Sequence, residues 1–327
     1  MTAFVLMIIS AIFGAGFATG AELVAFFGAS TLPPILISLI ISVSMFTFML
    51  VLIFACNHKL PNWIVRIISF VFLIAMIAGT TSLSNPIIAA ASIAGCIMII
   101  KLGFDNALKI NKYVMSFALT IIFLVSFLHL GDSSHATHWK PSLPDITWTT
   151  WRALLYAGMN CFLLIAVFGA SRKKYSTRQF VIASAVASTI IGFFAFVIMN
   201  AVYVNDVVRT VIPILQINGS FLVWLSIFVC IFTSMYIAML GVVSSSKPSE
   251  KSDKSLGNSD ISLFPLGIIS ISAFALSFLG FKKIIATFYP MIGIAMILYV
   301  SFISFWKLYS ALKLHFSSRH IRVHQGQ

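Results

Sequence analysis

Glu22 is the first residue of chemical interest in this sequence. The chain has eight acidic residues, and Glu22 is the only one inside a long apolar run. A carboxyl group in such a run is usually functional, as a proton carrier, a cation ligand or a contact to a substrate. Thr19 and Glu22 also have the spacing of a capping box, in which the carboxylate only binds a backbone amide at a helix start. Both interpretations stay open, because a cap that lines a cavity can do both.

The residues before Glu22 predict an interruption of the same helix. Gly14-Ala-Gly-Phe-Ala-Thr-Gly20 has three glycines in seven residues, and each costs about 1 kcal/mol in a helix relative to alanine. We expect a break, with a second half-helix that begins at Thr19; the alternative is a small-residue face for helix packing. A break frees N–H groups, which favour an anion, and C=O groups, which favour a cation.

A second small-residue stretch, Tyr156-Ala-Gly-Met-Asn-Cys161, lies in a later apolar run. Gly158 could open that helix, and Asn160 could cap its restart. The alternative is an ordinary packing site, since polar and small residues commonly bridge membrane helices. Interruptions at matching positions in two halves of a chain point to the binding site of a transporter.

A third candidate is the hydroxyl pair Thr233-Ser234. Adjacent hydroxyl groups could supply two oxygen ligands for a small cation, although such residues in membrane helices commonly bond their own backbone. The apolar runs contain no HExxH, no GxSxG and no carboxylate pair, and Ser171-Arg-Lys-Lys174 is a charge cluster in a predicted loop. We therefore expect that the protein is not an enzyme.

The composition predicts a membrane protein. The 327-residue chain is 60% hydrophobic and only 9% charged, whereas soluble domains have about 25% charged residues. Apolar runs bounded by charges, prolines or glycines predict an all-α polytopic protein with ten transmembrane helices. The predicted helices cover residues 3–28, 32–56, 63–82, 86–104, 112–131, 148–171, 178–203, 217–245, 262–281 and 284–309.

The distribution of positive charge predicts the orientation. With the N-terminus in the cytoplasm, sixteen of the 21 Lys and Arg residues fall on the cytoplasmic side and five on the outer side. This bias follows the positive-inside rule and places both termini in the cytoplasm. It also accounts for the net charge of +13 without a nucleic acid as partner, so the expected partners are the lipid bilayer and a small-molecule substrate.

We expect a single transmembrane domain over residues 1–310. Five helices per half is an odd number, so the second half has the opposite orientation, and the two repeats cover residues 1–131 and 148–310. The segment 244–260 is rich in Ser and Lys and is predicted to be a flexible cytoplasmic loop. Residues 311–327 are predicted to form a basic cytoplasmic tail.

The motif Gly14-Ala-Gly-Phe-Ala-Thr-Gly-Ala-Glu22 resembles the opening of the YkvI-type bacterial membrane proteins. Those proteins are similar to the amino acid–polyamine–organocation (APC) superfamily, whose LeuT-type fold is a five-plus-five inverted repeat with helices 1 and 6 discontinuous. Thr233-Ser234 and Tyr289-Pro290 fit the same pattern. The likeness covers most of the chain, and Ala21 departs from it where a Gln is expected.

The resemblance implies where a substrate and a coupling ion would bind. The substrate would lie between the breaks of helices 1 and 6, near Ala15, Gly16, Phe17, Ala18, Thr19, Glu22, Ala157, Gly158 and Asn160. A sodium ion would lie between the first and the eighth predicted helix, residues 3–28 and 217–245. It would be bound by the carbonyl groups of Gly14, Phe17 and Cys230 and the side chains of Thr233 and Ser234.

The implied function is a secondary active transporter in the bacterial plasma membrane, a cation-coupled symporter for an amino acid or similar small organic solute. Sodium or a proton is the expected coupling ion, because Thr233-Ser234 favours sodium and Glu22 favours protons; no other cofactor is expected. The alternative is a non-transporting ligand sensor or receptor subunit on the same fold.

Overall fold

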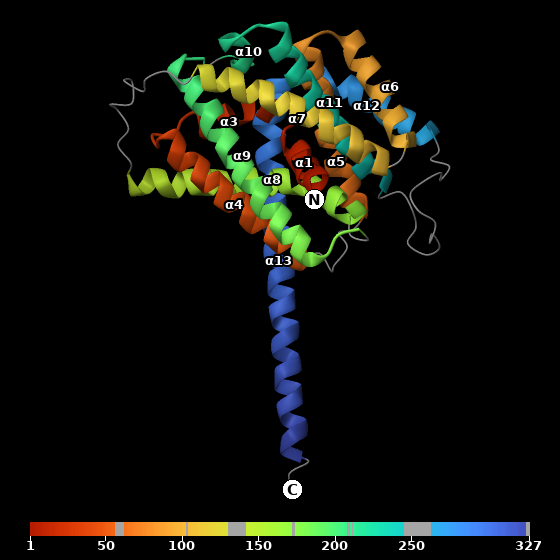
Figure 1. Ribbon diagram of the computed structural model, residues 1–327. Coiled ribbons are helices and arrows are strands. Elements are labelled where there is room, and N and C mark those ends of the chain that lie inside the picture. The colour runs from red at the N-terminus through yellow and green to blue at the C-terminus, as the bar shows by residue number, and fades with distance from the viewer. Residues whose placement is uncertain are drawn as a thin grey trace.

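The computed structural model describes residues 1–55, 62–102, 104–129, 142–171, 174–207, 210, 212–244 and 263–324. These residues form helices and no strands, which confirms the all-α prediction (Figure 1). In chain order the helices are α1 (Thr2–Ile12), α2 (Ala15–Thr19), α3 (Ala21–Phe27), α4 (Pro34–Ala55), α5 (Asn62–Leu83), α6 (Pro86–Leu102), α7 (Phe104–Leu128), α8 (Leu143–Ser171), α9 (Thr177–Val204), α10 (Pro213–Ile217), α11 (Phe221–Ser244), α12 (Leu263–Ser277) and α13 (Phe281–His324).

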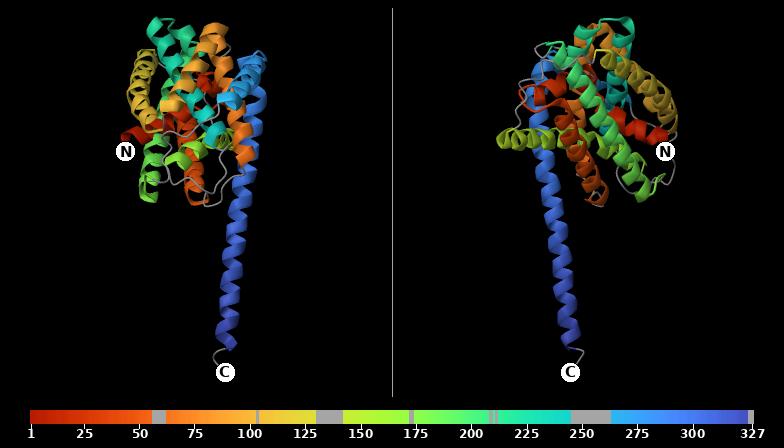
Figure 2. Two further views of the ribbon diagram at one scale, coloured as in Figure 1. Left: turned by 90° about the vertical axis from the view of Figure 1, so that its right-hand side faces the viewer. Right: turned by 60° about the vertical axis from the view of Figure 1, so that its left-hand side comes forward.

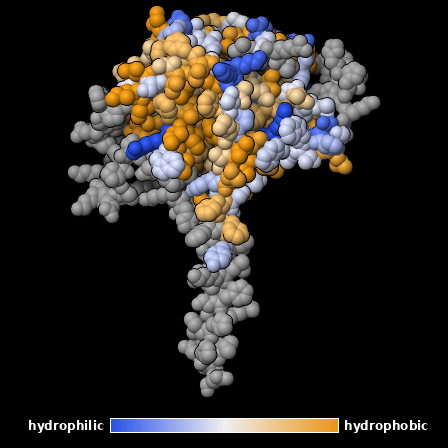
Figure 3. Space-filling view, turned by 180° about the vertical axis from the view of Figure 1, so that it is seen from behind, coloured by the Kyte–Doolittle hydropathy of each residue, from blue (hydrophilic) through white to orange (hydrophobic). Residues whose placement is uncertain are grey.

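The surface of the bundle is apolar, as a membrane protein requires. Six of the described helices, α4, α5, α7, α9, α11 and α13, are long and apolar enough to cross a membrane. On α4, Ile35, Leu39 and Val43 share one face and are each more than half exposed. Figure 3 shows apolar residues over much of one side of the bundle. Such a continuous apolar surface suits lipid better than water.

The first helix lies at the centre of the bundle. Every residue of α1 from Phe4 to Ile12 is buried, and α7, α8, α9 and α11 pack around it. A helix that is apolar on all sides belongs in such a position. Just beyond its end, the rings of Phe13 and Phe17 lie 4.1 Å apart, and Phe13 meets Phe194 edge-on at 5.1 Å. The interrupted segment is therefore held from several sides.

The predicted first span, residues 3–28, is divided into three helices. α1 ends at Ile12, and α2 begins after Gly14, whose backbone is extended. α2 and α3 meet at Gly20, which has a left-handed φ of 79°. Glycine adopts this conformation without the steric cost that a side chain brings. The prediction of a discontinuous first helix is confirmed, with two interruptions in place of one.

The predicted interruption of the sixth helix is wrong. α8 is continuous from Leu143 to Ser171. Asn160 caps no new helix, because its Nδ2 donates to the Tyr156 carbonyl at 3.0 Å inside α8. Gly158 packs α8 against α13: a Cβ there would lie 3.1 Å from the Gly293 carbonyl oxygen. The small-residue stretch therefore serves close helix packing, the alternative interpretation of this sequence.

α13 is the longest described helix and projects from the bundle. It has 44 residues, or about 66 Å at 1.5 Å per residue. It contains Pro290 and continues past residue 310, so the predicted tail begins as a continuation of this helix. Figures 1 and 2 show its C-terminal part extending beyond the other helices, and α8 crossing it steeply. Residues 245–260 of the predicted loop lie outside the described residues.

Candidate binding site at the interrupted first helix

The break between α1 and α2 is closed by a methionine. The Gly14 N–H donates to the Ile12 carbonyl at 2.7 Å, and the Ala15 N–H donates to Sδ of Met76 in α5 at 3.3 Å. A Cβ on Gly14 would lie 2.6 Å from the Met76 Cε atom, so the glycine allows the thioether to come this close. Because a thioether is a weak acceptor, the first amide of α2 is only weakly satisfied.

The predicted capping box at the second break is wrong. The N-cap of α3 is Gly20, and no side chain caps it. Thr19 Oγ1 donates to the Ala15 carbonyl at 2.7 Å and accepts from the Ala21 N–H at 3.3 Å. The left-handed Gly20 moves the helix start by one residue, so Glu22 is the second residue of α3. Its carboxyl group is then free to turn into the bundle.

The Glu22 carboxyl group is buried beside two tyrosines. Its side chain is 2% exposed and covers Gly16, where a Cβ would overlap the Glu22 Cγ, Cδ and Oε1 atoms. The Tyr156 hydroxyl donates to Oε2 at 3.5 Å. The Tyr289 hydroxyl also interacts with this carboxyl group, but it makes no hydrogen bond of normal geometry within the described residues. Tyr156 is therefore the hydrogen-bond donor to this carboxyl group, and Tyr289 is its neighbour.

None of the described Lys, Arg or His side chains pairs with Glu22. An ionised carboxylate without a compensating cation is costly to bury. The surroundings of Glu22 therefore suit a carboxyl group that holds a proton, or one that binds an incoming cation. Asp145 offers a contrast, since its carboxylate is exposed and accepts a hydrogen bond from Thr31 at 2.7 Å.

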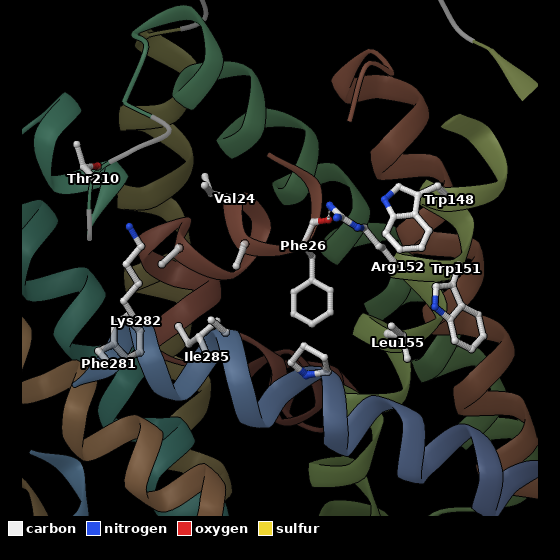
Figure 4. Close-up of a pocket in the computed structure, with 14 residues that line it drawn as sticks. Val24, Phe26, Trp148, Trp151, Arg152, Leu155, Thr210, Phe281, Lys282 and Ile285 are labelled. Carbon is white, nitrogen blue, oxygen red and sulfur yellow. Dashed lines mark hydrogen bonds between the residues drawn. The ribbon is translucent and has the colours of Figure 1, made fainter. Parts of the chain in front are cut away.

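A cavity of about 370 Å³ lies between α3, α8 and α13 (Figure 4). Its walls are formed by Ala21, Val24, Ala25, Phe26, Trp148, Trp151, Arg152, Leu155, Thr210, Phe281, Lys282, Ile285, Ala286 and Pro290. Among these, Ala21, Leu155 and Pro290 are the chain neighbours of Glu22, Tyr156 and Tyr289. The buried carboxyl cluster therefore adjoins the wall of the cavity.

Two cationic side chains lie toward opposite ends of this cavity (Figure 4). The Arg152 Nη1 donates to the Phe26 carbonyl at 2.9 Å, and its guanidinium carbon lies 4.9 Å from the centre of the Trp148 ring. Lys282 comes from the first turn of α13, and the wall between the two cations is mainly apolar. Such a cavity suits a small organic molecule with a carboxylate and an apolar body.

The structure brings together only part of the predicted substrate site. Ala15, Gly16, Phe17, Ala18 and Thr19 form α2 and are all buried. Glu22 lies over Gly16, and α8 reaches this region through contact with α3. Gly158 faces α13 instead, and Asn160 bonds its own helix. Ala157 is buried in the same continuous helix, so the predicted second wall of the site is not formed by a helix break.

The helix 1 carbonyl groups predicted to bind sodium have backbone partners. The Gly14 carbonyl accepts from the Ala18 N–H at 3.0 Å, and the Phe17 carbonyl accepts from the Gly20 N–H at 2.9 Å. These bonds are the turns that form and end α2. A carbonyl oxygen has two lone pairs, so the two oxygens remain chemically competent as ligands.

The groups that α11, the eighth predicted helix, supplies to the predicted sodium site also have partners. Thr233 Oγ1 donates to the Cys230 carbonyl at 3.0 Å, within its own helix. Ser234 Oγ donates to the Ser10 carbonyl at 2.5 Å, and Ser10 Oγ donates to Asn111 Oδ1 at 2.9 Å. Hydrogen bonds from hydroxyl groups thus link α11 to α1, and α1 to α7. Within the part of the chain that the structure describes, no group of three His, Cys, Asp or Glu residues could hold a metal.

Four residues of the site did not emerge from sequence reasoning about chemistry. In the sequence, Arg152 and Lys282 contribute only to the charge of the predicted outer side, and Tyr289 contributes only to the family resemblance. Met76 has no signal of its own, since a methionine in an apolar run is ordinary. A sequence signal was available for Arg152, because a cation just inside a span, next to Trp148, marks a membrane interface.

Neither a protein-family model nor a curated protein matches this chain.

Proposed function

We propose that the protein is a secondary active transporter of the bacterial plasma membrane, a cation-coupled symporter for an amino acid or similar small organic solute. In this proposal ten spans cross the membrane in a LeuT-like arrangement, with both termini cytoplasmic and the first helix interrupted. The observation that carries it is Glu22, a buried carboxyl group at an interrupted helix beside a cavity with two cations.

The cavity supports a solute that carries a carboxylate. Arg152 has five N–H donors, of which one is used by the Phe26 carbonyl, and a guanidinium can bind a carboxylate with two parallel hydrogen bonds. Lys282 adds a second positive charge. Both cations belong to the predicted outer side, where they would concentrate anionic solutes at the mouth of the cavity. Phe26 and Trp151 would contact the apolar part of the solute.

The coupling ion in this proposal is a proton carried by Glu22. The carboxyl group adjoins the cavity and has no cationic partner among the described residues, so a change of its protonation changes the charge beside the bound solute. The sodium alternative has less support. The Thr233 hydroxyl donates to its own helix and the Ser234 hydroxyl to Ser10, so binding an ion there requires both bonds to rearrange.

The moving part in this proposal is α2 with its two glycine junctions. α2 has five residues between Gly14 and Gly20, and a short element between two hinges can reorient without unfolding its neighbours. The weak bond from Ala15 to Met76 opposes such motion little. Reorientation of α2 would move Gly16 away from Glu22 and open the carboxyl group to the other side of the membrane, as alternating access requires.

Uptake into proteoliposomes tests the proposal. Labelled amino acids and small organic acids are supplied outside, with an inward proton gradient, an inward sodium gradient or neither. We expect uptake with the proton gradient, and we expect Glu22→Gln to abolish gradient-driven uptake while solute binding remains. Asp145→Asn is the control, because it also neutralises a carboxylate but at a partly exposed position outside the cavity.

Two outcomes would contradict this version of the proposal. If only a sodium gradient drives uptake, and Thr233→Val with Ser234→Ala abolishes it, the coupling ion is sodium and Glu22 has another role. If solutes raise the unfolding temperature of the protein but no gradient drives uptake, the protein binds its ligand without transporting it.

The second candidate function, a ligand sensor, is favoured by α13. The first turn of this helix supplies Phe281 and Lys282 to the cavity, and the same helix continues to His324 beyond the bundle (Figure 1). A ligand in the cavity would thus contact the helix that extends beyond the bundle, where a sensor would bind its signalling partner. The proteoliposome measurement separates the two functions, because a sensor binds without uptake.

A further inference from the structure

A second cavity lies at the opposite end of α1 from the glycine breaks. Its volume is about 600 Å³, and it is formed by the start of α1, the first half of α7 and the turn between α8 and α9. The polar lining consists of Lys109, Lys112, Tyr113, Lys174 and Tyr175. The residues of this cavity take no part in the Glu22 site, so a ligand bound here would be independent of the proposed transport function.

The lining carries three positive charges and no acidic residue. Lys112 and Lys174 approach the cavity from different elements, and the Lys112 Nζ lies 5.4 Å from the centre of the Tyr113 ring. Substitutions at Lys112 and Lys174, one from each element, therefore test whether this cavity binds an anion.

The turn that carries Lys174 is held in place by its surroundings. The N–H groups of Lys174 and Tyr175 both donate to the Ser171 carbonyl, at 2.9 and 3.2 Å. The Tyr175 ring stacks on buried Phe4 at 4.5 Å, and Ser176 begins α9 with a capping box. This wall is therefore an ordered part of the fold, and its lysine is presented at a defined place.

The cavity continues into an apolar stripe on α7. This stripe has the spacing of one helix face and consists of Tyr113, Phe117, Leu124 and Leu128. All four side chains are exposed, most of all Tyr113 at 71% and Leu128 at 77%. A tyrosine between a basic cluster and an apolar face is typical of the membrane interface. The arrangement offers positive charge for a head group and an adjoining apolar surface for acyl chains. A free anion would use only the first of these.

We propose that this cavity binds the phosphate group of an anionic phospholipid, with the acyl chains along the exposed stripe of α7. Basic pockets between membrane helices on the cytoplasmic side bind anionic head groups. The predicted orientation places Lys109, Lys112 and Lys174 on that side, and the proposal depends on this orientation. Inorganic phosphate shares the head-group chemistry but lacks the contact to α7.

Thermal unfolding of the detergent-purified protein tests the proposal. Dioleoylphosphatidylglycerol, dioleoylphosphatidylcholine and inorganic phosphate are titrated separately, and the shift in unfolding temperature gives an apparent affinity. We expect phosphatidylglycerol to bind most tightly. The double variant Lys112→Gln/Lys174→Gln should weaken it on the order of 25-fold, since each lysine near an anionic head group contributes about fivefold.

The matched control is Lys101→Gln/Lys283→Gln, which removes two exposed lysines outside the cavity and should leave the affinity unchanged. Gel filtration shows whether each variant is folded. If the cavity variant does not fold, the affinity of the wild-type protein for phosphatidylglycerol is measured at rising salt concentration instead. We expect the affinity to fall, and an affinity that does not depend on salt contradicts the proposal. Equal shifts with phosphatidylcholine, or equal losses in the control variant, also overturn it. An equal shift with inorganic phosphate overturns the assignment to lipid.

Discussion

The Glu22 side chain fills the space that a side chain at position 16 would need. A Cβ on Gly16 would overlap the Glu22 Cγ, Cδ and Oε1 atoms, so the two residues, one in α2 and one in α3, fit together across the left-handed Gly20. The glycine therefore makes room for the carboxyl group, and the position of that carboxyl group depends on how α2 and α3 are arranged.

Gly16→Ala should destabilise the protein and, under the proposed transport function, abolish gradient-driven uptake. Overpacking costs about 1–3 kcal/mol, reduced by up to about 1 kcal/mol because alanine favours the helix. The double variant Gly16→Ala/Glu22→Ala should be more stable than the sum of the two single changes predicts, because the overlap disappears. Thermal unfolding of all four proteins measures this coupling, and strict additivity would show that the two side chains do not compete for space.

Gly20→Ala should destabilise the protein by about 1–2 kcal/mol, the cost of a left-handed conformation for a residue with a Cβ. The neighbouring atoms are not the obstacle, since the nearest would lie 3.4 Å from the added Cβ. Gly20→Asn should cost less, because asparagine tolerates this conformation. Unfolding temperatures of the two variants check the order; equal losses would show that backbone strain is not the cause.

At the crossing of α8 and α13, an alanine substitution should lower the free energy of unfolding more at Gly293 than at Gly158. A Cβ on Gly293 would overlap the Leu155 carbonyl group, whereas a Cβ on Gly158 would lie 3.1 Å from its nearest neighbour. Both neighbours are backbone oxygens, but the one at Gly293 is much closer, so Gly293→Ala should cost about 3 kcal/mol and Gly158→Ala about 1 kcal/mol. Thermal unfolding measures both, and Gly267→Ala, with open space around it, is the control.

Asp145 should make stability depend on acid pH. Hydrogen bonds from Ser142 and then Thr31 lower the pKa of the Asp145 carboxyl group. Its ionised form therefore stabilises the folded state above the unfolded-state pKa, near 4, and this contribution is lost as pH falls through the lower folded-state pKa. The wild type should unfold at a higher temperature than Asp145→Asn at pH 7, and the difference should shrink progressively as the pH is lowered below the unfolded-state pKa.

A difference that persists unchanged at the lowest pH would show that the charge of Asp145 is not its cause. Thr31→Val should remove only part of the effect, because the bond from Ser142 remains.

The sequence predicts local features of this site and misses those that depend on distant partners. The three glycines Gly14, Gly16 and Gly20 weaken a helix wherever they lie, so the break was predictable. The direction of the Glu22 side chain was not, because its hydrogen-bond partner Tyr156 is 134 residues away. The spacing from Thr19 to Glu22 predicted a local cap, and the long-range contact replaced it.

The continuity of α8 could not be read from its residues for the same reason. Gly158 has the composition of a break, but its role is set by Gly293, which lies in the last helix. The cavity could not be predicted for the same reason, because Arg152 and Lys282, which both line it, are separated by most of the second half of the chain. The charge pattern predicts that both cations lie on the outer side of the membrane, but only the packing of α3, α8 and α13 brings them to one cavity.

Because α13 is long, a small movement at the cavity displaces the C-terminal end of this helix by a much larger distance. From Pro290 to His324 the helix runs for about 50 Å at 1.5 Å per residue, and a proline is where a helix bends most readily. By simple leverage, a change of about 5° in the bend at Pro290 displaces the far end by about 4 Å. Pro290 also lines the cavity, so this helix converts a rearrangement smaller than a side chain into a displacement of several ångströms at the end that lies beyond the bundle.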